Sequence, residues 1–210
     1  WFFARLDYQD KNKRLNDKEM EFVWRPNADE FGTDTQILTH ALYWQYAAPP
    51  GFDFDVLGED SPWIMDPTSP DFNGNTEADK LMAHLDERAE HYLTDDIMVL
   101  FGDDFNYMNA FQNYENMDNM IEYMNKYHSD KYFFRYSTPS DYVDAIQKHD
   151  VTWPTKYDDM FPYSDTPDSY WTGYFSSRAN DKSYIRKLSH NFHASNHHYS
   201  SKALNQETEM

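Results

Sequence analysis

The spacing of hydrophobic and polar residues along the 210-residue chain alternates between strand-like and helix-like stretches. Short apolar runs predict strands at residues 1–6, 97–101 and 132–136. The run at 97–101 is continuously apolar, as is typical of a strand in a parallel sheet. Apolar residues at helical spacing, or long uninterrupted polar stretches, predict helices at residues 9–24, 34–43, 76–93, 109–126 and 180–206.

Turn-forming and capping residues divide these elements. Residues 25–74 hold most of the prolines and glycines and predict a long irregular segment, broken only by the short helix at 34–43. Irregular segments of that length usually carry function. A threonine at 138, followed by proline at 139 and an acid at 141, predicts the start of a further helix. Residues 150–178 are predicted to be a second loop.

The order of elements, strand–helix–strand–helix with apolar strands, predicts an α/β fold built on a parallel sheet or barrel. We place residues 1–178 in this part of the fold. Residues 179–210 begin a separate helical domain. Aromatic residues make up 18% of the chain, which is enough to fill a hydrophobic core.

Charge and composition exclude several classes of partner. The formal net charge is −19, so nucleic acid and anionic membrane surfaces are poor partners. No apolar run approaches the ~20 residues of a membrane span. The chain has no cysteine, which excludes disulfides within it. Because it opens in the middle of an apolar run, we expect it to be an internal piece of a longer protein.

Two adjacent acids are the strongest candidates for chemistry. Asp103 and Asp104 directly follow the predicted strand 97–101, and the carboxyl ends of strands carry the active sites of α/β folds. A carboxyl group with the sheet behind it would be partly desolvated, which suits a general acid. The alternative interpretation is a polar turn that caps the next helix. On the residues alone, that alternative is the more frequent outcome.

Three further residues are candidates for binding. Arg5 lies in an apolar strand, where a charge needs a buried partner, either structural or at a ligand. Trp171 could stack against the apolar face of a sugar ring or could belong to an ordinary core. Tyr46, in the proline-rich segment, carries a weaker signal. The sequence also holds His190, His193, His197 and His198, whose spacing allows a metal site but equally fits a solvated helix.

Five segments, taken in order, resemble glycoside hydrolase family 38, and within it the lysosomal-type α-mannosidases. They are Phe2–Lys11 (FFARLDYQDK), Glu19–Arg25 (EMEFVWR), Gly102–Tyr107 (GDDFNY), Asp159–Asp165 (DMFPYSD) and Tyr170–Arg178 (YWTGYFSSR). The resemblance implies part of a (β/α) barrel-like catalytic domain followed by the start of a helical bundle. It also implies a zinc-dependent hydrolase that releases terminal α-linked mannose from oligosaccharides with retention of configuration.

The resemblance also assigns roles to residues of this chain. Asp104 would be the general acid/base, and Asp103 a supporting residue in the substrate site. Arg5 would lie beside the nucleophile, Tyr46 in the glycone site and Trp171 in the substrate pocket. The nucleophile and the zinc ligands of the family have no counterpart in this chain, so no metal ligand is expected within it.

The expected partners are therefore mannose-containing oligosaccharides and the remaining segments of the same enzyme, with homo-oligomer formation left open. The expected location is a lysosome, an equivalent acidic vacuole or the cell exterior. Two alternatives remain: an inactive family 38 relative that binds carbohydrate or helps assembly, and a Golgi-type mannosidase that trims N-glycans. A metal-binding protein that uses the C-terminal histidines is a third and weaker one.

Overall fold

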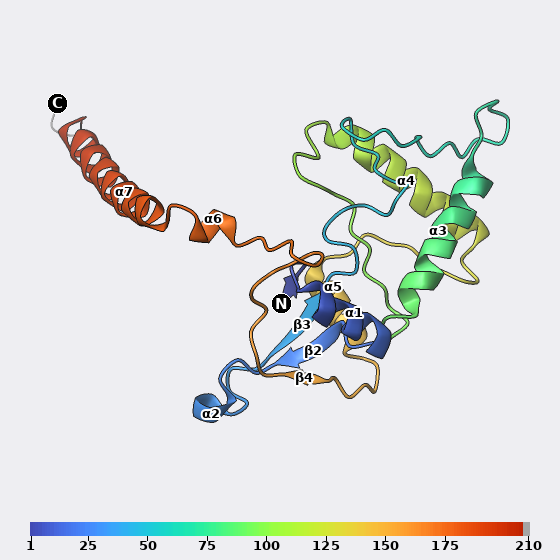
Figure 1. Ribbon diagram of the computed structural model, residues 1–210. Helices are drawn as coiled ribbons and strands as arrows, with labels where there is room; N and C mark the ends of the chain where they lie inside the picture. Colours follow the sequence, from blue (N-terminus) through green and yellow to red (C-terminus); the bar gives the residue numbers. More distant parts are fainter. Residues whose placement is uncertain (208–210) are drawn as a thin grey trace. The chain divides into compact units, whose positions relative to one another are not determined.

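The computed structural model describes residues 1–207 and divides into two compact units, Trp1–Phe161 and Pro162–Met210. Figure 1 shows the elements of both. The domain boundary expected at residue 178 remains a prediction. Within the described residues, no helix has the length and apolar character that crossing a membrane requires.

A four-stranded mixed sheet forms one part of the first unit, with the strand order β1-β3-β2-β4. The strands are β1 (Phe2–Phe3), β2 (Glu21–Trp24), β3 (Ile37–Ala41) and β4 (Thr155–Lys156). Strands β1 and β3 are parallel, as are β2 and β4, while β2 and β3 are antiparallel. The predicted α/β class is confirmed as a mixed α/β fold, whereas the barrel and the helical bundle stay predictions.

The antiparallel pair β2–β3 corrects two predicted helices, 9–24 and 34–43. Helix α1 (Tyr8–Asp17) begins at Asp7, whose side chain accepts the amide N–H of Gln9. It ends at Lys18, where φ is 58° and the chain leaves the helical conformation. The residues that follow pair across the sheet, Glu21 opposite His40 and Trp24 opposite Ile37. Pairing between segments distant in sequence therefore overrides the local helical spacing.

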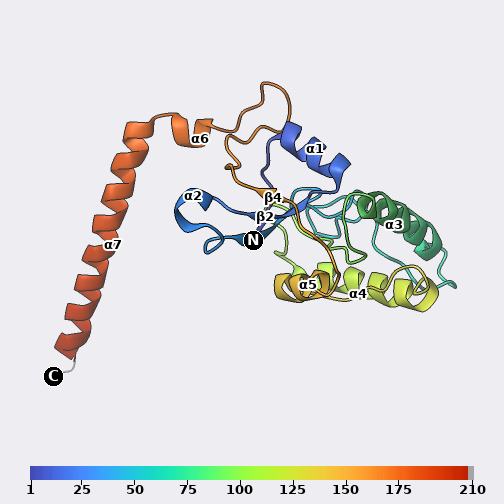
Figure 2. The same ribbon diagram turned by 90° about the horizontal axis from the view of Figure 1, so that it is seen from below.

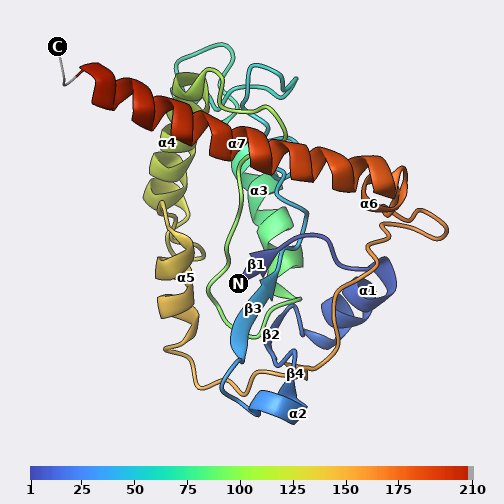
Figure 3. The ribbon, with the colours of Figure 1, turned by 90° about the vertical axis from the view of Figure 1, so that its left-hand side faces the viewer.

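The predicted strands 97–101 and 132–136 have no regular secondary structure and no strand pairing in the described structure, and the strand arrows of Figure 3 are those of β1 to β4. Side chains take up part of their backbone hydrogen-bonding capacity. Arg88 donates to the carbonyl of Met98 at 2.8 Å. The amide group of Asn125 both donates to Phe134 O and accepts from Phe134 N, each at 2.7 Å. Within residues 1–207 these two runs therefore form no sheet, which corrects the strands predicted there.

Three predicted helices of the first unit are confirmed near their expected positions. They are α3 (Gly74–Ala89), α4 (Ala110–Tyr127) and α5 (Pro139–Ile146). A four-residue helix, α2 (Ala28–Phe31), lies between β2 and β3. At α5 the Thr138 hydroxyl accepts the Asp141 amide N–H, and the Asp141 carboxylate accepts the Thr138 amide N–H. This reciprocal cap is what the threonine–proline–acid sequence predicts.

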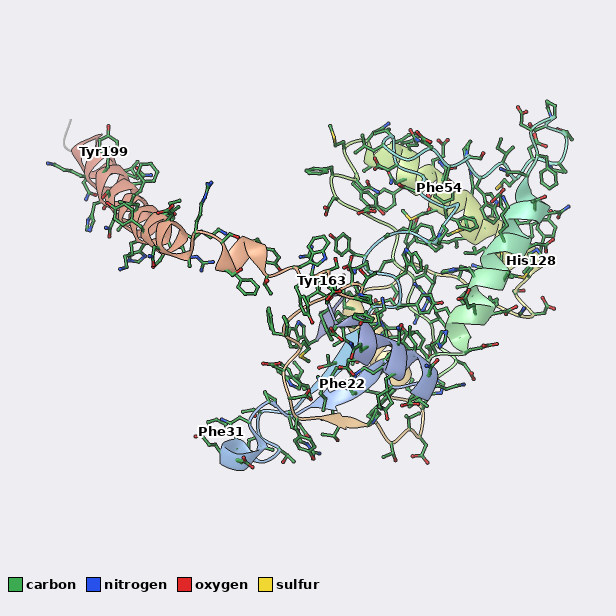
Figure 4. All side chains as sticks on the ribbon, in the orientation of Figure 1. Phe22, Phe31, Phe54, His128, Tyr163 and Tyr199 are labelled. Atoms are coloured by element: carbon green, nitrogen blue, oxygen red, sulfur yellow. The ribbon has the colours of Figure 1, made fainter. Side chains whose placement is uncertain are left out.

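The first unit holds two hydrophobic clusters, marked in Figure 4 by Phe22 and Phe54. Phe22 of β2 is fully buried and packs with Leu6 and Met20 beside the sheet. Phe54 belongs to the cluster in which helices α3 and α4 meet through residues such as Leu81 and Met120. The irregular segment before α3 contributes Phe52, Phe54 and Trp63 to that cluster, so it is well anchored despite its lack of regular structure.

The second unit contains the short helix α6 (Gly173–Ser176) and the long helix α7 (Ala179–Glu207), which Figure 2 shows as one continuous helix. The helix predicted at 180–206 is confirmed. Before α6, the chain folds back on itself through a bridge between Ser164 and Tyr170. This fold places Trp171 beside Tyr163.

Candidate active site

Asp104 lies in a turn at residues 104–109, between the irregular segment 97–101 and helix α4. The hydroxyl of Tyr46 donates a hydrogen bond to Asp104 Oδ1 at 3.1 Å. The side chain of the preceding residue, Asp103, accepts the amide N–H of Asp104 at 2.7 Å. Tyr46 thus donates to one oxygen of the Asp104 carboxylate, and Asp103 accepts the backbone N–H of Asp104.

The competing interpretation, a polar turn that caps the next helix, is right about the turn and wrong about the cap. Helix α4 begins after Asn109, five residues beyond Asp104, and Asn109 makes no capping hydrogen bond through its side chain. Neither Asp103 nor Asp104 contributes to the first turn of that helix. Their side chains bind instead within the turn and to Tyr46.

The surroundings of these carboxylates differ from the expectation in one respect. Asp103 and Asp104 are both exposed, so the apolar walls expected around them are not supplied by the part of the chain that the structure describes. Arg5 is also exposed and lies beyond the end of β1, which means that the predicted buried charge within a strand is wrong. The binding role assigned to Arg5 remains a prediction.

The irregular segment before α3 holds the turn of Asp104 in place. The sequence did not predict this contact. Ala48 N donates to the carbonyl of Gly102 at 3.0 Å, close to the point where Tyr46 reaches Asp104. Further along, Asp55 accepts the amide N–H of Tyr107 at 2.6 Å. A small hollow lies behind the turn, lined by residues of segments 48–54 and 101–107 and of helix α4. The only sequence signal for Asp55 is its position in a loop rich in aspartate and glycine.

Trp171 belongs to the second unit and is partly exposed, at 43%. Its amide donates to the carbonyl of Tyr163 at 3.1 Å, and the two rings are 5.8 Å apart between centroids. Tyr163 is buried and supports one side of the tryptophan. This arrangement leaves part of the indole available to a ligand, which fits the predicted role without testing it.

The histidines of α7 do not gather a set of metal ligands. Nε2 of His193 lies 3.0 Å from Nε2 of His197, and both side chains are exposed. Across residues 1–207, no three or more His, Asp or Glu side chains are grouped closely enough to hold a metal ion. The described residues therefore do not by themselves fit a zinc ion.

Residues 1–166 match the Glycosyl hydrolases family 38 N-terminal domain, and this region contains Tyr46, Asp103 and Asp104. The chain belongs to glycosyl hydrolase family 38. The family membership predicted from the five sequence segments is confirmed.

Proteins from distant organisms are similar along most of the chain. A protein of Dictyostelium discoideum named lysosomal alpha-mannosidase is 40% identical over 89% of this chain and 18% of its own length. Lysosomal alpha-mannosidases of Cavia porcellus and Homo sapiens are 39% and 38% identical, each over 91% of this chain and 19% of their own length. The chain thus spans less than a fifth of these relatives.

Proposed function

We propose that the protein to which this chain belongs is a retaining α-mannosidase that releases terminal α-linked mannose from oligosaccharides, with Asp104 as its general acid/base. The observation that carries the proposal is the hydrogen bond from Tyr46 to Asp104 Oδ1 in a family 38 domain. The names of the lysosomal relatives support mannose as the sugar and a lysosome or acidic vacuole as the location.

In this mechanism Asp104 acts twice. As an acid it donates a proton to the bridging oxygen, so that the leaving sugar departs as a neutral alcohol. As a carboxylate it then accepts a proton from the water that cleaves the glycosyl-enzyme. The two displacements each invert the anomeric carbon, so together they retain its configuration. The hydroxyl of Tyr46 occupies one lone-pair direction of Oδ1 and so directs the other oxygen.

The nucleophile and the zinc ion of the proposed enzyme would come from outside this chain. Zinc, when bound, would supply a Lewis acid that polarises sugar hydroxyls. Residues 1–207 offer no group of ligands for it, so the role given to the chain is confined to proton transfer and substrate contacts. Trp171 and Arg5 are the proposed contacts besides Tyr46, with Asp103 in support.

The proposal is tested with Asp104→Asn in the full-length protein. We expect turnover of a mannosyl disaccharide, which has a poor leaving group, to fall by about 10²–10⁴-fold. An activated aryl mannoside should lose far less rate in the glycosylation step, because its leaving group needs no proton. Full activity of the variant on the disaccharide would contradict the assignment.

The matched control is Asp118→Asn. Asp118 is an exposed aspartate that accepts the hydroxyl of Tyr136 at 2.8 Å, which reproduces the Asp104–Tyr46 pair away from the turn. We expect it to leave both substrates unaffected. Anomeric NMR of the first product formed by the unmodified enzyme tests retention, and the appearance of β-mannose would contradict it.

A further inference from the structure

The turn that follows Asp104 has an unfavourable backbone conformation. Phe105 and Tyr107 have φ values of 66° and 67°, in the left-handed region that residues with a Cβ atom seldom adopt. Such a conformation persists only where surrounding contacts impose it. Phe105 is largely exposed, so the contacts that hold the turn must act mainly through its other residues.

Asp55 supplies the contact at Tyr107. Its side chain is almost completely buried, at 1% exposure for the residue, beside Phe54, which Figure 4 labels near α4. Its Oδ2 accepts the Tyr107 amide N–H at 2.6 Å, and its Oδ1 accepts the Leu57 amide N–H at 3.1 Å. These backbone donors, that of Tyr107 above all, together with the side chain of Asn113, hold the pKa of Asp55 below its ordinary value. Asp55 is therefore a buried carboxylate.

Weaker contacts surround this central one. Asn106 donates from its side chain to Asp53 Oδ1 at 3.3 Å, and the Tyr107 hydroxyl donates to the carbonyl of Phe101. Asp55, with Asn113 of α4 on one side and Tyr107 on the other, joins the loop, the helix and the turn at one point. Among these contacts, Asp55 is the one that fixes the backbone of a left-handed residue directly.

We propose that Asp55 is a positioning residue for Asp104. By holding Tyr107 in its left-handed conformation, it fixes the turn and with it the direction in which the Asp104 carboxylate leaves the backbone. It touches neither the substrate nor the reacting atoms. This inference rests on the proposed role of Asp104 as the acid/base and adds to it the group that aims it.

The test is Asp55→Asn in the full-length protein. Asparagine keeps the shape but replaces one acceptor oxygen by an NH₂ group. Its single oxygen cannot accept both the Tyr107 and the Leu57 N–H, and the NH₂ group then faces one of these donors. A misdirected acid should lower kcat/KM on a mannosyl disaccharide by about 10- to 100-fold, since small misplacements of reacting groups have effects of that size. On an activated aryl mannoside we expect less than about a threefold change in kcat/KM, which reports formation of the glycosyl-enzyme and not its hydrolysis.

Asp66→Asn is the matched control. Asp66 lies in the same irregular segment and accepts the amide N–H of Thr68 at 2.8 Å, but it is exposed and its contacts are local. We expect both substrates to be turned over at the unmodified rate. A loss in this variant as large as in Asp55→Asn would overturn the assignment, because any aspartate of the loop would then have the same effect.

Asp104→Asn, measured alongside, separates the two proposals. If it shows no dependence on the leaving group, the proposed function fails and the role of Asp55 fails with it. If it shows that dependence while Asp55→Asn slows both substrates equally, or neither, only the positioning role is wrong. Should Asp55→Asn not fold, Asn113→Ala removes one donor to Asp55 and gives the same comparison. A smaller loss confined to the disaccharide supports the proposal, and a uniform loss contradicts it.

Discussion

The hydroxyl of Tyr46 and the carboxylate of Asp104 meet at 3.1 Å across 58 positions of sequence. Tyr46 comes from the proline-rich segment before α3 and Asp104 from the turn before α4. The backbone contact between Ala48 N and Gly102 O, at 3.0 Å, lies beside this pair and fixes the two segments against each other. The tyrosine therefore acts from a defined position, and its hydroxyl can be tested without disturbing the fold.

Tyr46→Phe should lower kcat on a mannosyl disaccharide by about 10-fold, because the Asp104 carboxylate loses the donor that fixes its rotation. The aromatic ring is kept, so we expect no change in the thermal unfolding midpoint. Steady-state kinetics of the full-length protein provide the measurement. Tyr136→Phe, which removes the hydroxyl that contacts Asp118, is the control and should behave as the unmodified enzyme. Equal losses of kcat in the two variants would contradict a special role of Tyr46.

Which features the sequence could predict depended on whether they are local. The cap formed by Thr138 and Asp141 follows from three neighbouring residues, and the structure confirms it. The segment Glu21–Trp24 was predicted as helix because Met20, Phe22 and Val23 fit one helical face. Its strand conformation depends on pairing with Ile37–Ala41, and that partner had itself been predicted as helix.

The candidate site shows the same division. Asp104 and Tyr46 could each be singled out from family-like segments, but their contact needs the fold that joins two loops. Asp55 was missed because its partners, the amide of Tyr107 and the side chain of Asn113, lie more than fifty residues away. The exposure of Asp104 was also unexpected, since the described residues leave open the side on which walls were predicted.

Trp171→Ala should weaken the binding of mannose-type ligands by about 10-fold, in line with the contribution of an aromatic ring that packs against a ligand. Its backbone hydrogen bond to Tyr163 O survives the substitution, so the loop should remain folded. Calorimetric titration of the full-length protein with a mannoside gives the affinity, and circular dichroism reports folding. Tyr174→Ala, an exposed aromatic residue three positions further on, is the control. A Trp171 variant that unfolds would indicate a core role instead.

The contacts of Asp86 should make the stability of helix α3 depend on pH in the acid range. Lys131 Nζ lies 2.6 Å from Asp86 Oδ2, and the Tyr132 hydroxyl donates to Oδ1 at 2.8 Å. These contacts, Lys131 first, lower the pKa of Asp86 below its ordinary value of 3.8. A lowered pKa means that the stabilisation is fully present above pH 3.8 and is lost as the pH falls through the folded-state pKa.

The measurement for Asp86 is hydrogen exchange of the α3 amides in the full-length protein at a series of pH values. The difference in protection between the unmodified protein and Asp86→Asn should be constant from pH 7 to about pH 5 and should shrink below about pH 4. Lys131→Met, which removes the partner that lowers the pKa of Asp86 most, should reduce the same difference in protection. A difference that grows on acidification would contradict the direction given for the pKa of Asp86.

Thr138→Ala should destabilise the first turn of α5 by about 1 kcal/mol, the usual contribution of a threonine N-cap. The substitution leaves the amide N–H of Asp141 without its acceptor at 3.2 Å, while the Asp141 carboxylate can still accept the amide of residue 138. Slower or unchanged exchange of the Asp141 amide would show that the reciprocal cap of Thr138 and Asp141 does not limit the opening of this turn. Ser140→Ala, an exposed position within the same turn, separates capping from helix propensity, because alanine favours the helix there. We therefore expect opposite signs for the two variants, and a common sign would mean that propensity alone determines the stability of α5.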